Sequence, residues 1–186
     1  MSPVAAPTLE TERLILRARR ADDLEHSLAL WCDPTVYKFI AGKPSTREDV
    51  WRGILRDIGQ WQIVGFGFWV VEEKASGIYI GEMGYLDCKR DVIPAMDETP
   101  EVGWVLGTAY HGNGFATEAM TAIQSWGDAN LAPKTTACII SPENTPSLRL
   151  AKKLGFKEIA MTNYKGEPTI MMRRLATNRP THSRPK

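Results

Sequence analysis

The fold is decided by the stretch Tyr110-His111-Gly112-Asn113-Gly114-Phe115-Ala116-Thr117-Glu118-Ala119. The apolar run Val102-Gly103-Trp104-Val105-Leu106 precedes it and predicts a buried strand. After it, apolar residues recur at the spacing of one helix face: Ala116, Ala119, Met120, Ile123 and Trp126. Two glycines therefore stand where a strand ends and a helix begins.

Gly112 and Gly114 favour a phosphate-binding loop. Neither residue carries a Cβ, so the backbone can approach a ligand closely. The free N–H groups of the first helical turn point to the same place, and the helix dipole favours an anion there. From the glycines alone, an ordinary turn between strand and helix remains an equal alternative.

Other nucleotide-binding loops fit this stretch less well. Thr117 takes the last place of G-x-G-x-x-G, where a Rossmann loop has glycine or alanine, and the loop lies past mid-chain. A P-loop requires Gly-Lys-Ser or Gly-Lys-Thr, which the sequence does not contain. A nicotinamide-dependent oxidoreductase is therefore only a third hypothesis.

Segment 109–119 resembles the acyl-CoA loop of the GNAT superfamily of N-acetyltransferases, whose pattern is Gln/Arg-x-x-Gly-x-Gly/Ala. The similarity is to the branch typified by acetyltransferases of ribosomal-protein N-terminal amines. Ala109 stands at the Gln/Arg place, a departure that this branch often shows. A second match, Asn144-Thr145-Pro146-Ser147 followed by Leu154-Gly155-Phe156, resembles the family's Asn-x-x-Ser…Leu-Gly-Phe segment. With the opening Thr11–Arg17, the resemblance covers nearly the whole chain.

The resemblance implies an α/β (α+β) fold. Its central mixed, mostly antiparallel sheet has helices on both faces and a splayed pair of parallel strands at the acyl-CoA site. One domain is expected over residues 9–175, after a loose leader at 1–8 and before a basic, disordered tail at 176–186. The β-branched run 135–140 agrees with a buried parallel strand in a strand–helix–strand unit.

Hydrophobic periodicity predicts the remaining elements. A strand with one buried face is expected at 11–18, and further strands are expected at 65–72, 78–87, 156–162 and 169–175. Gly81 and Gly84 inside one of these strands indicate a bulge or a close backbone approach.

Polar residues predict where helices begin and end. Asp22 or Asp23 is expected to cap one helix, and Ser45 with Glu48 is expected to form the capping box of the next. Gly155 is expected just after the end of a later helix.

The resemblance implies acetyl-CoA as the donor and assigns two groups of contact residues. The first follows the strand, the loop and the helix start: Val105, Leu106, Gly107, His111, Gly112, Asn113, Gly114, Phe115, Ala116 and Thr117. The second lies downstream: Asn144, Ser147 and Lys153. A backbone N–H of the strand is implied to bind the thioester carbonyl and to stabilise the oxyanion of the tetrahedral intermediate.

Glu101 is the candidate general base. Attack on a thioester requires a neutral amine, and free amines are mostly protonated at pH 7. A carboxylate at the head of the cleft can take that proton, directly or through water, as a matching glutamate does in several GNAT enzymes. Glu82 and Asp87 are the alternative candidates for the base. The structural alternative for Glu101 itself is a solvated residue at the start of a strand, without a catalytic role. Ser147 is the first candidate for a general acid and Tyr164 the second, although a thiolate leaves without much help.

The acceptor is predicted to be a primary amine, either a protein N-terminus or a small molecule, that attacks directly in a ternary complex. The resemblance implies that Tyr37, Phe39 and Trp51 are candidates for the acceptor wall. The polar loop 88–100 is long enough to reach over the cleft. Because of Ala109 and the uncertain base, a catalytically inactive acyl-CoA-binding regulatory module remains the alternative.

Composition excludes several other classes. The formal net charge of the 186 residues is +1, so no global field favours nucleic acid or a membrane surface. Cys32, Cys88 and Cys138 are odd in number and scattered, as in reduced cytoplasmic proteins, and no metal site is expected. No long apolar span appears, so we expect a cytoplasmic protein without a membrane partner; a homodimer stays open.

Overall fold

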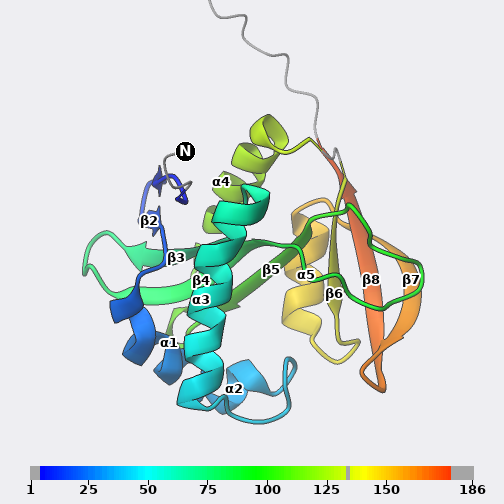
Figure 1. The fold of residues 1–186 in the computed structure, drawn as a ribbon, viewed down its shortest axis with the longest axis horizontal. Coiled ribbons are helices and arrows are strands. Elements are labelled where there is room, and N and C mark those ends of the chain that lie inside the picture. The colour runs from blue at the N-terminus through cyan, green and yellow to red at the C-terminus, as the bar shows by residue number, and fades with distance from the viewer. Residues whose placement is uncertain (1–4, 133–134, 177–186) are drawn as a thin grey trace, which may run out of the picture.

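The structure is a computed structural model that describes residues 5–132 and 135–176. The first half of the leader and all of the predicted tail except Ala176 therefore lie outside the described residues. One mixed sheet runs through the described residues in the order β1-β2-β3-β4-β5-β6-β8-β7 (Figure 1). Its strands are β1 Leu9–Glu10, β2 Leu14–Arg17, β3 Phe68–Glu73, β4 Tyr79–Leu86, β5 Glu101–Leu106, β6 Thr135–Ile140, β7 Lys157–Tyr164 and β8 Glu167–Leu175. Neighbours are antiparallel except β5 and β6, which confirms the predicted sheet.

Helices cover both faces of this sheet. They are η1 Ala21–Asp23, α1 Leu24–Trp31, α2 Pro34–Tyr37, α3 Arg47–Val64, η2 Thr108–Tyr110, α4 Phe115–Asn130 and α5 Thr145–Lys153. Val105 packs with Leu30 of α1 and Val36 of α2, whereas the next residue, Leu106, packs in the main core with Met120 of α4. Successive strand residues point to opposite faces, so α1 and α2 lie across the sheet from α4. Figure 1 shows α3 crossing the front of β3, β4 and β5.

The apolar pattern of the sequence is confirmed where one face of an element is buried. Leu14 and Leu16 of β2 are fully buried, and the other residues of that strand are half-buried. Gly155 has a φ of +87° directly after the cap of α5, as predicted. Ala6 and Pro7 of the expected leader meet the domain: Ala6 is buried and the Pro7 carbonyl accepts a hydrogen bond from Trp69 Nε1 (2.8 Å).

The glycines of β4 allow the close approach that the sequence predicts. A Cβ at Gly84 would lie 2.3 Å from the Gly67 carbonyl oxygen, and one at Gly81 would lie 2.3 Å from the Val105 carbonyl oxygen. No side chain fits at either distance. β4 therefore lies tightly between β3 and β5, the strand that leads to the loop.

The capping box of α3 begins one residue later than predicted. Thr46 Oγ1 accepts from the Asp49 N–H (3.1 Å), and Asp49 Oδ2 accepts from the Thr46 N–H (3.1 Å). The prediction of Ser45 with Glu48 is wrong because the Ser45 N–H is already used by the Trp31 carbonyl (3.3 Å). Thr46 and Asp49, one position further along the chain, form the capping box instead.

Two further boundaries differ from prediction. Asp23 occupies the N-cap of α1, but its carboxylate binds Arg17 (2.6 Å) and the Arg20 N–H (2.7 Å) and makes no cap hydrogen bond to that helix. Gly65 does not begin a strand: with a φ of +76° it ends α3, which runs to Val64, and β3 starts at Phe68. A left-handed position after a helix favours glycine because it has no Cβ.

Candidate active site

The two parallel strands, β5 and β6, pair near their first residues and then separate. Glu101 and Ala137 form the register pair between β5 and β6 in the described chain, and the Ala137 N–H donates to the Pro100 carbonyl (3.1 Å). Beyond this point β5 pairs with β4 alone. The Gly107 N–H donates to Ile80, so by antiparallel alternation Trp104 and Leu106 direct their backbone groups toward the gap. The predicted splay is therefore present.

The loop after β5 places open amides at the end of this gap. Gly112 (φ +78°) and Gly114 (φ +81°) are both left-handed, and Gly114 is the N-cap of α4 without any side-chain cap. The first-turn N–H groups of α4, from Phe115 to Thr117, therefore meet no capping side chain. This arrangement fits a pyrophosphate, because these amides and the helix dipole favour an anion. We call residues 107–114 the donor loop.

Arg13, the residue before β2, clamps the donor loop, a contact that sequence reasoning missed. Its Nε donates to Glu118 Oε2 (2.7 Å), and its Nη1 donates to the Asn113 carbonyl (3.0 Å). Its guanidinium lies 4.4 Å from the centroid of the Phe115 ring. Partial burial works against ionisation of Glu118, but hydrogen bonds from Thr11 and Arg13 lower its pKa. Arg13 belongs to the opening segment Thr11–Arg17, which contributes to the family resemblance. That resemblance was the available signal, but it assigned no role to Arg13.

The His111 side chain contacts the end of β5. Its Nε2 lies 2.8 Å from the Leu106 carbonyl oxygen. A carbonyl only accepts, so Nε2 carries the proton in this contact. Asn113 donates to the His111 carbonyl (3.2 Å), so the loop is also tied to itself.

A hydrogen bond across the splay joins β5 to α5. Trp104 Nε1 donates to Ser147 Oγ (3.2 Å), and the Ser147 N–H donates to Asn144 Oδ1 (3.2 Å). Asn144, not Ser147, is thus the cap of α5. Lys153 ends that helix six positions after Ser147, about 9 Å along the helix axis, so the structure does not bring the two side chains together.

Glu101 lies at the closed end of the splay and is 6% exposed, so it is not a solvated strand-start residue. Its two carboxylate oxygens accept from Nε and Nη2 of Arg90, the latter at 2.7 Å. The Arg90 guanidinium also lies 4.6 Å from the centroid of the Tyr164 ring. By alternation, Glu101 shares the α1 and α2 face of the sheet with Val105.

Glu82 is the register partner of Val105, but its carboxylate is already hydrogen-bonded to several other side chains. It is 1% exposed and accepts from Arg19 (2.6 and 2.7 Å), Ser27 (2.5 Å), Trp31 (3.1 Å) and Tyr79. Burial, and then the negative charge of Glu82, raise the pKa of Tyr79. Glu82 therefore has a structural role.

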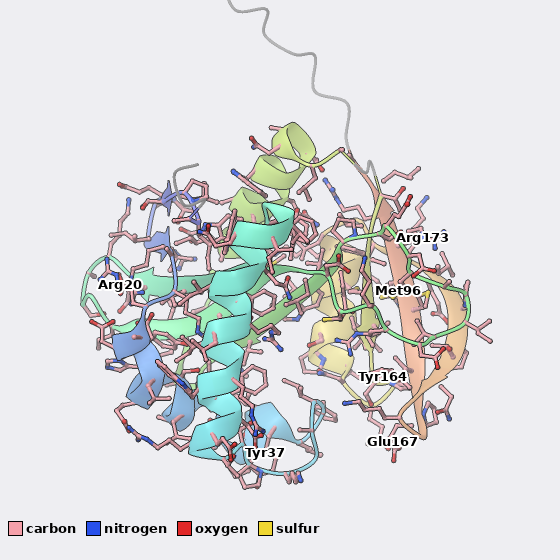
Figure 2. All side chains as sticks on the ribbon, in the orientation of Figure 1. Arg20, Tyr37, Met96, Tyr164, Glu167 and Arg173 are labelled. Atoms are coloured by element: carbon pink, nitrogen blue, oxygen red, sulfur yellow. The ribbon has the colours of Figure 1, made fainter. Side chains whose placement is uncertain are left out.

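The residues predicted to form the acceptor wall lie in the segment after α1 and on α3. Tyr37 and Phe39 are half-buried in residues 33–45, which we call the acceptor segment, and Trp51 of α3 is 38% exposed. In Figure 2, Tyr37 and the β7–β8 hairpin with Tyr164 and Glu167 lie at the same end of the molecule.

The loop before β5 covers the sheet face that the helices leave open. Val92 and Met96 pack with Ala137 of β6 and Met171 of β8 in a second buried cluster. The loop that was expected to reach over the cleft thus forms a wall beside it, and it supplies the Arg90 that binds Glu101.

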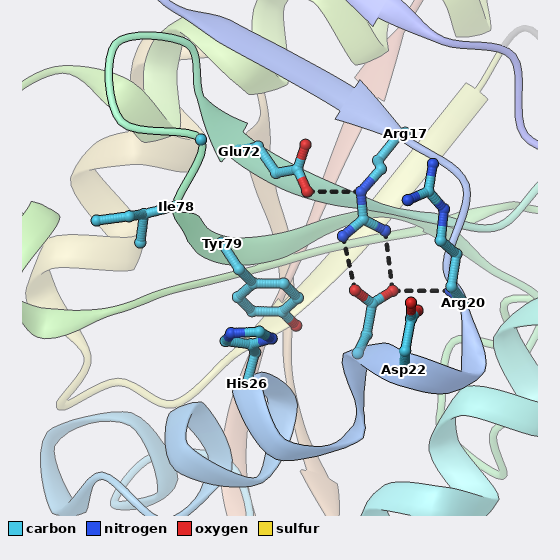
Figure 3. A pocket seen from close by; sticks show the side chains of 9 residues that line it. Arg17, Arg20, Asp22, His26, Glu72, Ile78 and Tyr79 are labelled. Atoms are coloured by element: carbon cyan, nitrogen blue, oxygen red, sulfur yellow. Dashed lines mark hydrogen bonds and ion pairs between the residues drawn. The ribbon is translucent and has the colours of Figure 1, made fainter.

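A separate cavity of about 270 Å³ lies between η1, α1 and the β3–β4 hairpin (Figure 3). None of the predicted donor residues lines it. Its charged side chains largely bind one another, since Arg17 bridges Asp23 (2.6 Å) and Glu72 (2.6 Å). We assign it no part in the site.

The described residues contain neither a membrane-spanning helix nor a cluster of metal ligands. No helix there is sufficiently long and apolar to cross a bilayer. The described side chains include no group of three or more His, Cys, Asp or Glu placed to hold a metal ion.

Comparison with known proteins shows the class to which this site belongs. A sequence model of the acetyltransferase (GNAT) domain matches residues 13–157. The chain therefore belongs to the GNAT acetyltransferase family. It is an acyl-CoA-dependent N-acetyltransferase, an enzyme that moves an acetyl group from acetyl-CoA to an amine.

Individual relatives agree with this assignment. The uncharacterised N-acetyltransferase p20 of Bacillus licheniformis is 30% identical over 153 residues, which cover 81% of this chain and 83% of the relative. A solved GNAT-family acetyltransferase from Bordetella pertussis is 27% identical, with a TM-score of 0.82 over 91% of this chain and 99% of its own. A ribosomal L7/L12 α-N-protein acetyltransferase, solved in complex with CoA, shares the fold at 12% identity, with a TM-score of 0.75 over 91% and 98%.

Proposed function

We propose that acetyl-CoA binds along the splay between β5 and β6, with its pyrophosphate on the donor loop. The observation that carries this proposal is the combination of a strand edge with unpaired backbone groups and uncapped amides at the start of α4. The acetyl group then lies beside Val105 and Leu106. The backbone N–H groups of Trp104 and Leu106 are oriented to bind the thioester oxygen and the oxyanion that forms from it.

The acceptor amine attacks the thioester carbon directly from the α1 and α2 face. A carbon–nitrogen bond forms, the carbon–sulfur bond breaks, and CoA leaves as a thiolate. Because that thiolate is a good leaving group, Ser147 needs only to lie near the sulfur and to donate a hydrogen bond through its hydroxyl. Trp104 Nε1 donates to Ser147 Oγ and so leaves that hydroxyl hydrogen free to point elsewhere.

Glu101 accepts the proton of the amine through water. Four residues separate Glu101 from Val105, about 13 Å along a strand, which is too far for direct contact with an amine at the acetyl group. The two residues share one face of the sheet. A Cβ at Gly103 between them would lie 2.8 Å from the Phe68 ring, so the water molecules have to pass beside that ring. Arg90 pairs directly with this carboxylate.

The acceptor that we favour is the N-terminal amine of a protein, in the cytoplasm. The support is the resemblance of the donor loop to the ribosomal-protein branch and the fold shared with a ribosomal L7/L12 α-N-protein acetyltransferase. The acceptor segment and the β7–β8 hairpin lie at one end of the molecule, where an extended chain terminus has access.

The test begins with thermal-shift titrations of the protein with acetyl-CoA, longer acyl-CoAs and NAD. A ligand that binds the native state raises the melting temperature by mass action. Acetyl-CoA is expected to give a shift and NAD none. Release of CoA is then assayed with peptides bearing free N-terminal amines and with small amines.

Glu101→Gln separates catalysis from binding. We expect turnover to fall about a hundredfold, as for the loss of a general base, while the acetyl-CoA shift is retained. Glu158→Gln, an exposed carboxylate on β7, is the matched control. No turnover with any amine despite CoA binding would favour the inactive CoA-binding module instead.

A further inference from the structure

The acceptor segment is a loop whose two ends are held together by hydrogen bonds. At its base, the Ser45 N–H donates to the Trp31 carbonyl (3.3 Å), and Cys32 Sγ lies 3.4 Å from the Ser45 carbonyl oxygen. Within it, Ile40, Ala41 and Gly42 donate their N–H groups to the Tyr37 carbonyl, at 2.9 to 3.1 Å. The segment that carries the candidate acceptor residues Tyr37 and Phe39 is therefore organised around the end of α2.

Asp33 fixes the start of α2. Its Oδ1 accepts from the Thr35 N–H (2.8 Å), and its backbone carbonyl accepts from the N–H groups of Val36 (2.9 Å) and Tyr37 (3.0 Å). A four-residue helix has little stability of its own, so its place depends on this cap and on outside contacts.

Among the described residues, one hydrogen bond joins the acceptor segment to the donor loop. Thr108 Oγ1 donates to Asp33 Oδ2 (2.6 Å), from the first residue of η2 to the cap of α2. An apolar contact runs beside it, since Val36 of α2 packs in the same cluster as Val105 of β5. These two contacts both fall on the stretch of β5 and η2 where the proposed function places the acetyl end of the donor.

We propose that Asp33 is a positioning residue that couples the donor loop to the acceptor segment through the hydroxyl of Thr108. Binding of CoA restrains residues 107–114, Thr108 among them. The hydrogen bond passes that restraint to Asp33 and so holds α2, with Tyr37 and Phe39, where the amine enters. This inference rests on the proposed position of CoA on the donor loop.

The test is hydrogen–deuterium exchange on the full chain, with and without saturating CoA. In the wild type, CoA is expected to slow exchange both at residues 112–119 and at residues 37–42. In Thr108→Val, which removes only the hydroxyl, protection at 112–119 is expected to persist. Protection at 37–42 is expected to fall about fivefold, the size of one solvent-exposed hydrogen bond.

Thr108→Ser is the matched control because it keeps the hydroxyl and loses only a methyl group. It is expected to restore CoA-dependent protection at residues 37–42, which a merely structural effect of the substitution would not do. Equal protection in Thr108→Val and the wild type, or no CoA-dependent change at 37–42 in the wild type, overturns the coupling. Absence of protection at 112–119 in the wild type overturns the proposed position of CoA, and the coupling with it.

Discussion

The donor loop and the acceptor segment lie side by side, but they are held very differently. Arg13 binds Glu118, the Asn113 carbonyl and the Phe115 ring, and His111 closes the loop onto the Leu106 carbonyl. The acceptor segment meets the donor loop through Thr108 and packs through Val36. Regions with few buried contacts open locally at low free-energy cost. We infer that this enzyme presents a rigid donor half and an adaptable acceptor half.

The largest expected effect comes from breaking the donor half at Gly114. Gly114→Ala places a side chain at a φ of +81° and a Cβ at the N-terminus of α4. We expect CoA affinity, measured by calorimetry, to fall at least about tenfold, because relief of a backbone strain of about 1–2 kcal/mol moves the amides at the start of α4 that are proposed to face the pyrophosphate. Gly155→Ala is the control: it has a φ of +87° and open space around it, so it shares the strain but should leave affinity unchanged. Equal affinity losses in both variants would contradict the prediction.

Loosening the donor loop without touching its backbone should have a smaller effect. Arg13→Ala removes the clamp on Glu118 and Phe115. The Arg13 side chain is 43% exposed, so solvent screening limits the loss of stability to about 1 kcal/mol. CoA affinity is expected to fall about fivefold. Arg20→Ala, an exposed arginine beside the cavity of Figure 3, should change neither quantity. An Arg13→Ala variant with wild-type CoA affinity would show that the clamp does not shape the loop.

On the acceptor half, Trp51→Ala should act on the amine alone. Trp51 is partly exposed on α3, a helix that contributes no residue to the donor loop. We expect KM for the amine to rise about threefold, as for the loss of a partly desolvated aromatic contact. KM for acetyl-CoA and the melting temperature should stay within error. An effect on acetyl-CoA instead would remove Trp51 from the acceptor wall.

The smallest expected effect is a pH dependence carried by Glu118. Its folded-state pKa is lowered, so its contribution to stability is present above the unfolded value of about 4.3 and is lost as pH falls through the folded pKa. The wild type should therefore melt above Glu118→Gln at pH 7, by an amount that shrinks below about pH 4. Melting curves of both proteins from pH 7 to pH 3 measure this. A constant difference over that range would contradict the assigned cause.

Most of the fold was predictable because its signals are local. The alternation at Leu14 and Leu16, the β-branched run of β6 and the glycines of the donor loop each determine a conformation within a few residues. One boundary was mispredicted because two adjacent residues compete for one role. Ser45 and Thr46 both suit a cap, and the contact between Ser45 and Trp31 decides between them.

The candidate site was less predictable because its charges find partners far away in the sequence. From the sequence alone, Glu101 and Glu82 are both interpreted as carboxylates without a partner on their strands. In the fold, one is bound by Arg90 of the preceding loop and the other by Arg19 near the start of the chain. Spacing along a strand indicates which face a residue occupies, but not which distant arginine reaches that face.

By itself, the sequence determined the order of strands and helices, the left-handed turn that opens α4, and the family to which the chain belongs. These follow from backbone preferences and short-range apolar periodicity, which act over a few residues. Only the tertiary structure decided that Arg13 clamps the donor loop, that Arg90 pairs with Glu101 and that Thr108 binds Asp33. Such pairings depend on which side chains the folded sheet brings within about 3 Å, and hydrogen bonds lose their strength beyond that distance.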